Sequence, residues 1–163
     1  TGLGGMAFRD LSKKMIGVDL SAEMINKAKE KDIYNELIVG DLLDVLADFT
    51  KKQELFDLFI CTDVLIYIGD CIELFAAIKK IAHSDSLFLF STETKYGGGY
   101  SLLNTGRYAH SHSYIENCAA YYSYEILALE KIVLRQSSNK DINGHIYIMK
   151  INDSTDYVRN LVN

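Results

Sequence analysis

The chain alternates short apolar runs with segments of helical spacing, and this alternation constrains its fold more than any other feature. Four compact apolar runs have the length and composition of buried strands, at residues 14–19, 36–40, 55–61 and 86–91. Helices are expected between them, at residues 21–31, 43–49 and 71–82, with Ser21 placed to cap the first. Strict alternation of strands and helices favours an α/β fold, a mostly parallel sheet with helices on both faces.

The second half of the chain departs from this alternation. Residues Lys95–Arg107 are rich in glycine and tyrosine and predict an ordered loop, and a helix is expected over His110–Tyr122. Two final strands near Ile126–Arg135 and His145–Ile151 flank the polar turn Ser137–Asn143. So short a connection implies a hairpin, which adds an antiparallel pair at the edge of the sheet.

The sequence begins with a glycine-rich turn, Gly2-Leu3-Gly4-Gly5, ahead of a short helix. Such a loop normally leaves a strand, and no strand precedes Thr1. We therefore expect the sequence to open inside a ligand-binding loop, with the first strand of the domain missing. Right-handed crossovers then place strands 36–40 and 55–61 on opposite sides of a gap that the missing strand would fill.

Length and composition indicate one ordinary globular domain, which we place over residues 1–151, with residues 152–163 as a tail or short helix. The net charge of −5 argues against duplex nucleic acid or an anionic membrane as partner. The three cysteines are widely spaced and form no C-x-x-C pair, as expected of buried thiols in a reducing compartment. No signal peptide or membrane-spanning run is evident, so we expect a cytoplasmic protein.

Glycines and acids occupy the positions where such a sheet binds ligands. Gly2 and Gly4 would let the backbone approach a ligand closely at a helix N-terminus, although any tight turn also uses glycine. Asp19 ends the first run, where a carboxylate can accept hydrogen bonds from ribose hydroxyls; alternatively it stabilises the helix after Ser21. Asp41 follows the second run and can accept from the adenine amine while Leu42 packs on the ring, or it can cap the next helix.

The third run leads into Cys61-Thr62-Asp63-Val64-Leu65-Ile66-Tyr67, whose polar atoms would face the reactive end of a ligand. A nicotinamide dehydrogenase shares the glycines and the first acid, but it needs neither the second acid nor a late edge hairpin.

These segments resemble the motifs of class I S-adenosylmethionine-dependent methyltransferases, which have a Rossmann-like fold. Thr1-Gly2-Leu3-Gly4-Gly5 resembles the back half of their glycine motif, and Gly17–Met24 resembles the second motif. Gly40-Asp41-Leu42 is similar to the third motif, and Phe56–Leu65 to the fourth. Gly106–Ser111 with Tyr114-Ile115 looks like a bacterial subgroup that is sometimes attached to TPR repeats. The family's Pro-Gly-Gly turn is replaced by His83-Ser84-Asp85-Ser86.

The resemblance implies methyl transfer from S-adenosylmethionine to an acceptor that we expect to be a small molecule. The implied cofactor contacts are Gly2, Gly4, Asp19, Leu20, Met24, Asp41, Leu42 and Thr62. The acceptor would meet Tyr67, Arg107, Tyr108 and His110, with Tyr67 and His110 as candidate catalytic residues. His110 and His112 are spaced unfavourably for a shared metal ion on a helix, and we expect no metal.

Two other functions remain open at this point. A cofactor-binding regulatory or scaffold module without catalytic activity would carry the same motifs. A nicotinamide oxidoreductase is the remaining alternative, and it would bind NADH rather than S-adenosylhomocysteine.

Overall fold

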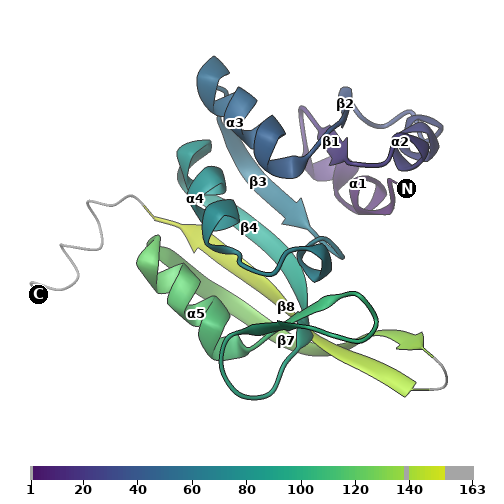
Figure 1. Ribbon diagram of the computed structural model, residues 1–163. Helices are drawn as coiled ribbons and strands as arrows, with labels where there is room; N and C mark the ends of the chain where they lie inside the picture. The colour runs from purple at the N-terminus through teal and green to yellow at the C-terminus, as the bar shows by residue number, and fades with distance from the viewer. Residues whose placement is uncertain (1, 138–139, 153–163) are drawn as a thin grey trace, which may run out of the picture. The chain divides into compact units, whose positions relative to one another are not determined.

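The computed structural model describes residues 2–137 and 140–152 (Figure 1). The chain divides into two compact units, Thr1–Glu54 and Leu55–Asn163. The expected division into a domain over 1–151 and a tail stays a prediction, and most of that tail lies outside the described residues.

The first unit is a two-stranded parallel sheet with three α-helices. In chain order its elements are α1 (Leu3–Phe8), the 3-10 helix η1 (Arg9–Leu11), β1 (Ile16–Asp19), α2 (Ala22–Lys29), β2 (Glu36–Val39) and α3 (Leu42–Lys52). Strands β1 and β2 pair in register from Ile16 opposite Glu36 to Asp19 opposite Val39. Helix α2 packs on both strands and buries Ile25. The strands and helices predicted for this part of the chain are confirmed.

The second unit is a six-stranded mixed sheet with two α-helices. Its elements are β3 (Phe56–Cys61), the 3-10 helix η2 (Leu65–Tyr67), α4 (Ile72–Lys80), β4 (Ala82–Thr94), β5 (Tyr100–Leu102), β6 (Tyr108–His110), α5 (His112–Tyr121), β7 (Tyr124–Ser137) and β8 (Lys140–Ile151). The strand order is β5-β6-β4-β8-β7, with β3 paired to β4. Among the described residues β1 pairs only with β2 and β3 only with β4, so each has one free edge. The expected first strand stays a prediction.

The prediction of a mostly parallel sheet is imprecise, although the α/β class is confirmed. Over the described ranges, three ladders are parallel (β1–β2, β3–β4 and β4–β6) and three are antiparallel (β4–β8, β5–β6 and β7–β8). Strand β8 runs between β4 and β7, so the predicted C-terminal hairpin contributes two antiparallel ladders at once. The hairpin strands extend to Ser137 and Lys140, which pair with each other. The predicted turn Ser137–Asn143 is therefore shorter than expected, and residues 138–139 lie outside the description.

The segment predicted as a loop over Lys95–Arg107 contains strand β5, which forms an antiparallel hairpin with β6. The helix predicted from His110 begins instead at His112, because Ser111 accepts a hydrogen bond from the amide of Tyr114 and caps it. His110 belongs to β6, which adds in parallel to the end of β4. These corrections move His110 from a helix end onto a strand.

Strand β4 is longer than predicted at both ends, and it takes in the polar stretch 83–86 that the sequence suggests as a turn. Asp85 has a φ of 68° within it, and the preceding helix ends at Lys80 rather than at Ala82. At its start Ala82 pairs with Phe56 of β3, and at its end β4 pairs with β8 as far as Glu93 and with β6 as far as Thr94.

An aromatic core joins the helices to the sheet in the second unit. Helices α4 and α5 contact each other and cover one face of this sheet (Figure 1). Phe75 of α4 lies edge-on to the rings of Phe88, Phe90 and Tyr124, at centroid distances of 5.5, 5.8 and 5.0 Å. The Tyr124 hydroxyl donates to the Phe75 carbonyl at 2.8 Å, so the polar atom of this core has a partner.

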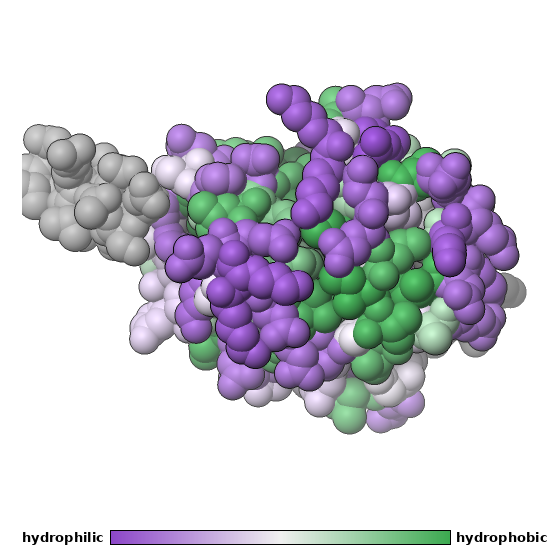
Figure 2. All heavy atoms as spheres, turned by 90° about the horizontal axis from the view of Figure 1, so that it is seen from above, coloured by the Kyte–Doolittle hydropathy of each residue, from purple (hydrophilic) through white to green (hydrophobic). Residues whose placement is uncertain are grey.

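Hydrophobic side chains also gather on the surface. Figure 2 shows a hydrophobic patch bordered by hydrophilic side chains on one face of the molecule. Among the exposed large hydrophobic residues, Leu20 follows β1 directly and Tyr67 lies in the loop after β3. These two bear on the candidate site, because ligands of such sheets bind beyond the carboxyl ends of the strands.

None of the described helices has the length and apolar character needed to cross a membrane.

Candidate functional site

The glycine-rich segment is a turn only at Gly2, because α1 already begins at Leu3 and includes Gly4 and Gly5. Gly2 has φ +80° and ψ 8°, and its carbonyl accepts from the amide of Met6 at 3.1 Å as α1 begins. A left-handed residue is favourable there only for glycine. Gly4 is half-buried within α1, and Gly5 packs so closely on Tyr34 that an added Cβ would lie 2.2 Å from its hydroxyl oxygen. Thr1 lies outside the described residues.

Asp19 is the last residue of β1 and is half-buried. Its Oδ1 accepts from the amide of Ser21 at 2.9 Å. No hydrogen-bond partner within the described ranges reaches Oδ2, so one carboxylate oxygen is available to a ligand. Leu20, next in the chain, is 74% exposed.

A small hollow opens beside Asp19 within the first unit. Its walls are Gly2, Gly17, Val18, Asp19, Met24, Ile25, Ala28, Tyr34 and Leu37. Its volume is about 60 Å³, whereas a ligand pocket typically measures roughly 300 Å³ or more. The hollow can therefore hold only part of a nucleoside-sized ligand.

Asp41 is exposed and caps α3, since its Oδ1 accepts from the amide of Leu43 at 2.9 Å. Leu42, the first residue of the helix, is half-buried. The cap uses one oxygen, so capping and ligand binding do not exclude each other. Asp19 is the last residue of β1, and Asp41 follows two residues after the last residue of β2. These two strands pair in parallel.

The loop that leaves β3 begins with Thr62, which is exposed, and Asp63, which has a φ of 61°. The amide of Asp63 donates to Ser91 Oγ at 3.0 Å, and its carboxylate lies 3.8 Å from Nη1 of Arg135. Arg135 also forms an ion pair with buried Glu93 on β4. This network was not foreseen from the sequence, where the one available signal is the acidic residue Glu93 at the end of an apolar run.

Tyr67 lies on η2, and its side chain projects to solvent with 68% exposure. Strand β6 contacts η2, which brings the element of Tyr67 beside that of Tyr108 and His110. Tyr108 and Arg107 are half-buried. The structure thus gathers the elements that carry the expected acceptor residues, but it does not bring the four side chains into one enclosed pocket.

His110 is fully buried. Its Nε2 lies 2.9 Å from the carbonyl oxygen of Gly69 and 3.4 Å from Sγ of Cys71. Because a carbonyl only accepts, Nε2 carries the hydrogen of this bond. Burial lowers the pKa of His110, and the hydrogen bond to Gly69 opposes that effect.

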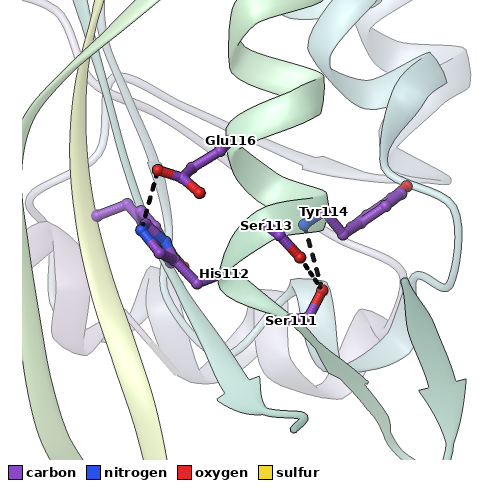
Figure 3. Close-up of polar contacts among 6 residues, drawn as sticks. Ser111, His112, Ser113, Tyr114 and Glu116 are labelled. Carbon is purple, nitrogen blue, oxygen red and sulfur yellow. Dashed lines mark hydrogen bonds and ion pairs between the residues drawn. The ribbon is translucent and has the colours of Figure 1, made fainter. Parts of the chain in front are cut away.

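The start of α5 presents polar groups on two sides (Figure 3). His112 Nε2 pairs with Glu116 at 3.2 Å, and its Nδ1 lies 3.1 Å from the hydroxyl of Tyr147. The side chain of Tyr114 points away from the His112–Glu116 pair. No group of three histidine, cysteine or acidic side chains suited to a metal ion occurs in the parts of the chain that are described.

Comparison with known proteins identifies the family. The methyltransferase domain family matches residues 3–123, which is most of the chain. This chain belongs to the methyltransferase domain family. The match spans both units and includes every residue expected at the site except Gly2. No curated protein matches this methyltransferase domain.

Solved structures resemble this methyltransferase domain over most of its length. A structure described as SAM-dependent methyltransferases from Methanosarcina mazei is 11% identical, with 91% of this chain and 86% of that chain covered and a TM-score of 0.65. A methyltransferase from Clostridium acetobutylicum is 16% identical, with coverages of 91% and 79% and a TM-score of 0.68.

The N-methyltransferase NodS from Bradyrhizobium japonicum, in complex with S-adenosyl-L-homocysteine, is 15% identical, with coverages of 93% and 74% and a TM-score of 0.70. At such identities the likeness shows the fold, which is the Rossmann-like α/β fold of methyltransferases.

Proposed function

We propose that this methyltransferase domain transfers the methyl group of S-adenosylmethionine to a small-molecule acceptor. The observation that carries the proposal is the free carboxylate oxygen of Asp19 beside the hollow that Gly2 and Met24 help to form. A carboxylate in that place can accept from the two hydroxyls of a ribose. Family membership and the S-adenosylhomocysteine complex of NodS support this choice of nucleoside.

The remaining cofactor contacts follow from the ends of the strands. Asp41 would accept from the adenine amine with its second oxygen, while Leu42 packs on the ring. Leu20, 74% exposed, would cover the ribose. Gly2 and Gly4 would admit the amino-acid end of the cofactor, and Thr62 would meet it at the exit of β3.

Bound S-adenosylmethionine supplies an activated methyl group on a sulfonium. The S–CH3 bond breaks with its electron pair going to sulfur, and the acceptor's lone pair forms the new bond to the methyl carbon. The protein's task is then to align the acceptor, and a base is needed only where the acceptor is protonated. We assign this alignment to Tyr67 and Tyr108. Arg107 would suit an acceptor with a carboxylate or phosphate, whose oxygens match a pair of its guanidinium N–H donors.

Transfer of radiolabelled methyl from S-adenosylmethionine tests the proposal on a panel of small carboxylates, phenols and amines. We expect a labelled product, with S-adenosylhomocysteine formed in equal amount, and loss of label with Asp19→Ala. Binding of S-adenosylhomocysteine without transfer to any acceptor would instead indicate a regulatory or scaffold module.

Asp41→Asn is expected to weaken S-adenosylhomocysteine binding by less than Asp19→Ala does. The asparagine oxygen keeps the cap of α3, and its NH2 group replaces the second carboxylate oxygen, so one hydrogen bond from the adenine amine is lost instead of the two ribose hydrogen bonds that Asp19→Ala removes. Isothermal titration calorimetry measures both affinities. A loss as large as that of Asp19→Ala would show that the charge matters at position 41, and the adenine contact would then be wrong.

A further inference from the structure

We propose that His110 and Tyr114 are positioning residues, which hold the turn Gly69–Cys71 and thereby fix Tyr67 on the acceptor side of the site. The inference rests on the proposed function for what Tyr67 meets. The contacts themselves lie wholly within the second unit. In this proposal His110 acts indirectly: it holds the turn, and the turn holds Tyr67, which meets the acceptor. His110 does not act as a base.

His110 anchors the first residue of the turn. Its Nε2 donates to the carbonyl oxygen of Gly69 across 41 residues of sequence, at 2.9 Å. The ring is fully buried, so it reaches no ligand from its place in β6. Without this donor, the carbonyl of half-buried Gly69 would lose the hydrogen bond that ties it to β6.

Tyr114 anchors the rest of the turn. Its hydroxyl accepts from the amide of Cys71 at 2.7 Å and donates to Asp70 Oδ1, also at 2.7 Å. The same Oδ1 accepts from the amide of Ile72 at 3.0 Å, at the start of α4. One phenol therefore joins the end of the loop, the start of α4 and helix α5.

Two tyrosine rings of the β5–β6 hairpin pack closely on Gly69. A Cβ at this position would lie 2.7 Å from Cε1 of Tyr108 and 3.0 Å from Cε2 of Tyr100. The β5–β6 hairpin therefore rests directly on the turn. Substitution by any larger residue would separate the two.

Tyr67 needs such support because its own side chain has little. Its side chain is 68% exposed, and the backbone hydrogen bonds of its short helix are local. The amide of Tyr67 donates to the carbonyl of Val64 at 3.0 Å, and the amide of Ile68 donates to the carbonyl of Leu65 at 3.0 Å. Buried Leu65 and Ile66 fix one end of the segment. The anchored turn fixes the other end, so the phenol of Tyr67 projects from a rigid loop.

Amide hydrogen exchange of residues 62–71 tests the proposal in the full chain. His110→Leu and Tyr114→Phe are expected to raise exchange at Gly69–Cys71 by about tenfold or more, because each removes a hydrogen bond of the turn. His110→Gln keeps an N–H donor at the place of Nε2 and should restore exchange to within about threefold of the wild type.

Matched controls separate local from global effects. Tyr121→Phe makes the same chemical change on α5 at an exposed residue and should leave exchange of the turn unchanged. Ile115→Val removes one methylene group from a buried side chain of α5 and should lower the stability of the packed helix. It leaves the side chains of His110 and Tyr114 unchanged. If His110→Leu and Tyr114→Phe change the turn no more than these controls, or if His110→Gln fails to rescue it, the proposal is wrong.

A second measurement follows the mobility of the side chain at position 67 by fluorescence anisotropy. The chain has no tryptophan, so Tyr67→Trp introduces a single tryptophan, which can be excited selectively at a wavelength where tyrosine does not absorb. Adding His110→Leu should lower its anisotropy, whereas adding His110→Gln should not; equal anisotropy in both would overturn the proposal. The proposed function fails separately, if the wild-type chain neither binds S-adenosylhomocysteine nor transfers methyl, whatever the exchange of the turn.

Discussion

Replacing Phe75 by alanine is expected to lower the free energy of unfolding by about 3–5 kcal/mol, the usual cost of deleting a buried phenylalanine ring. Phe75 is fully buried and touches three other aromatic rings, those of Phe88, Phe90 and Tyr124. Its carbonyl keeps the hydrogen bond from Tyr124 in the variant, so the loss comes from the ring alone.

Urea denaturation followed by circular dichroism measures this loss. Ile72→Ala, on the same helix but 44% exposed, should cost about 1 kcal/mol or less. Equal losses for the two variants would show that the aromatic cluster is not the centre of the core of the second unit.

Asp19→Ala is expected to weaken S-adenosylhomocysteine binding by about 2–4 kcal/mol, on the order of 30- to 1000-fold, because charge-assisted hydrogen bonds to both ribose hydroxyls are lost. Asp19 ends β1, and its Oδ2 faces no other described donor. The variant also loses the bond from the Ser21 amide, so thermal unfolding is recorded beside the calorimetry.

Asp19→Asn is the matched variant for this position. It keeps an acceptor for the Ser21 amide, so its fold should be intact while its affinity falls by an intermediate amount. Unchanged affinity in Asp19→Ala would assign Asp19 to local stabilisation of α2 and would remove the ribose contact.

The parallel part of the fold could be predicted because its signals are local. Apolar runs of strand length predict β1, β2 and β3. Ser21 caps α2, and Asp41 caps α3. Strands β5 and β6 could not be predicted, since three residues in each carry no periodicity and their pairing depends on the end of β4. The polar start of β4 likewise depends on tertiary contacts with β3, where Ala82 pairs with Phe56 and the Ser86 hydroxyl donates to the carbonyl of Phe56.

The candidate site divides in the same way. The positions of Asp19, Asp41 and Thr62 at or just after the ends of β1, β2 and β3 could be predicted, because the apolar runs before them predict these strands. The buried position of His110 could not, because it depends on a carbonyl 41 residues away. The contacts of Tyr114 and Arg135 could not be predicted for the same reason, because their partners Asp70 and Glu93 are 44 and 42 residues away in the sequence.

Calorimetric titration of the wild-type chain with S-adenosylhomocysteine, and in parallel with NADH, tests the central claim most directly. Both ligands offer an adenosine to Asp19 and Asp41, but only the first carries the amino-acid end that Gly2, Gly4 and Thr62 are proposed above to receive. We predict saturable binding of one S-adenosylhomocysteine per chain and no binding of NADH. Saturable binding of NADH without any binding of S-adenosylhomocysteine would contradict the account.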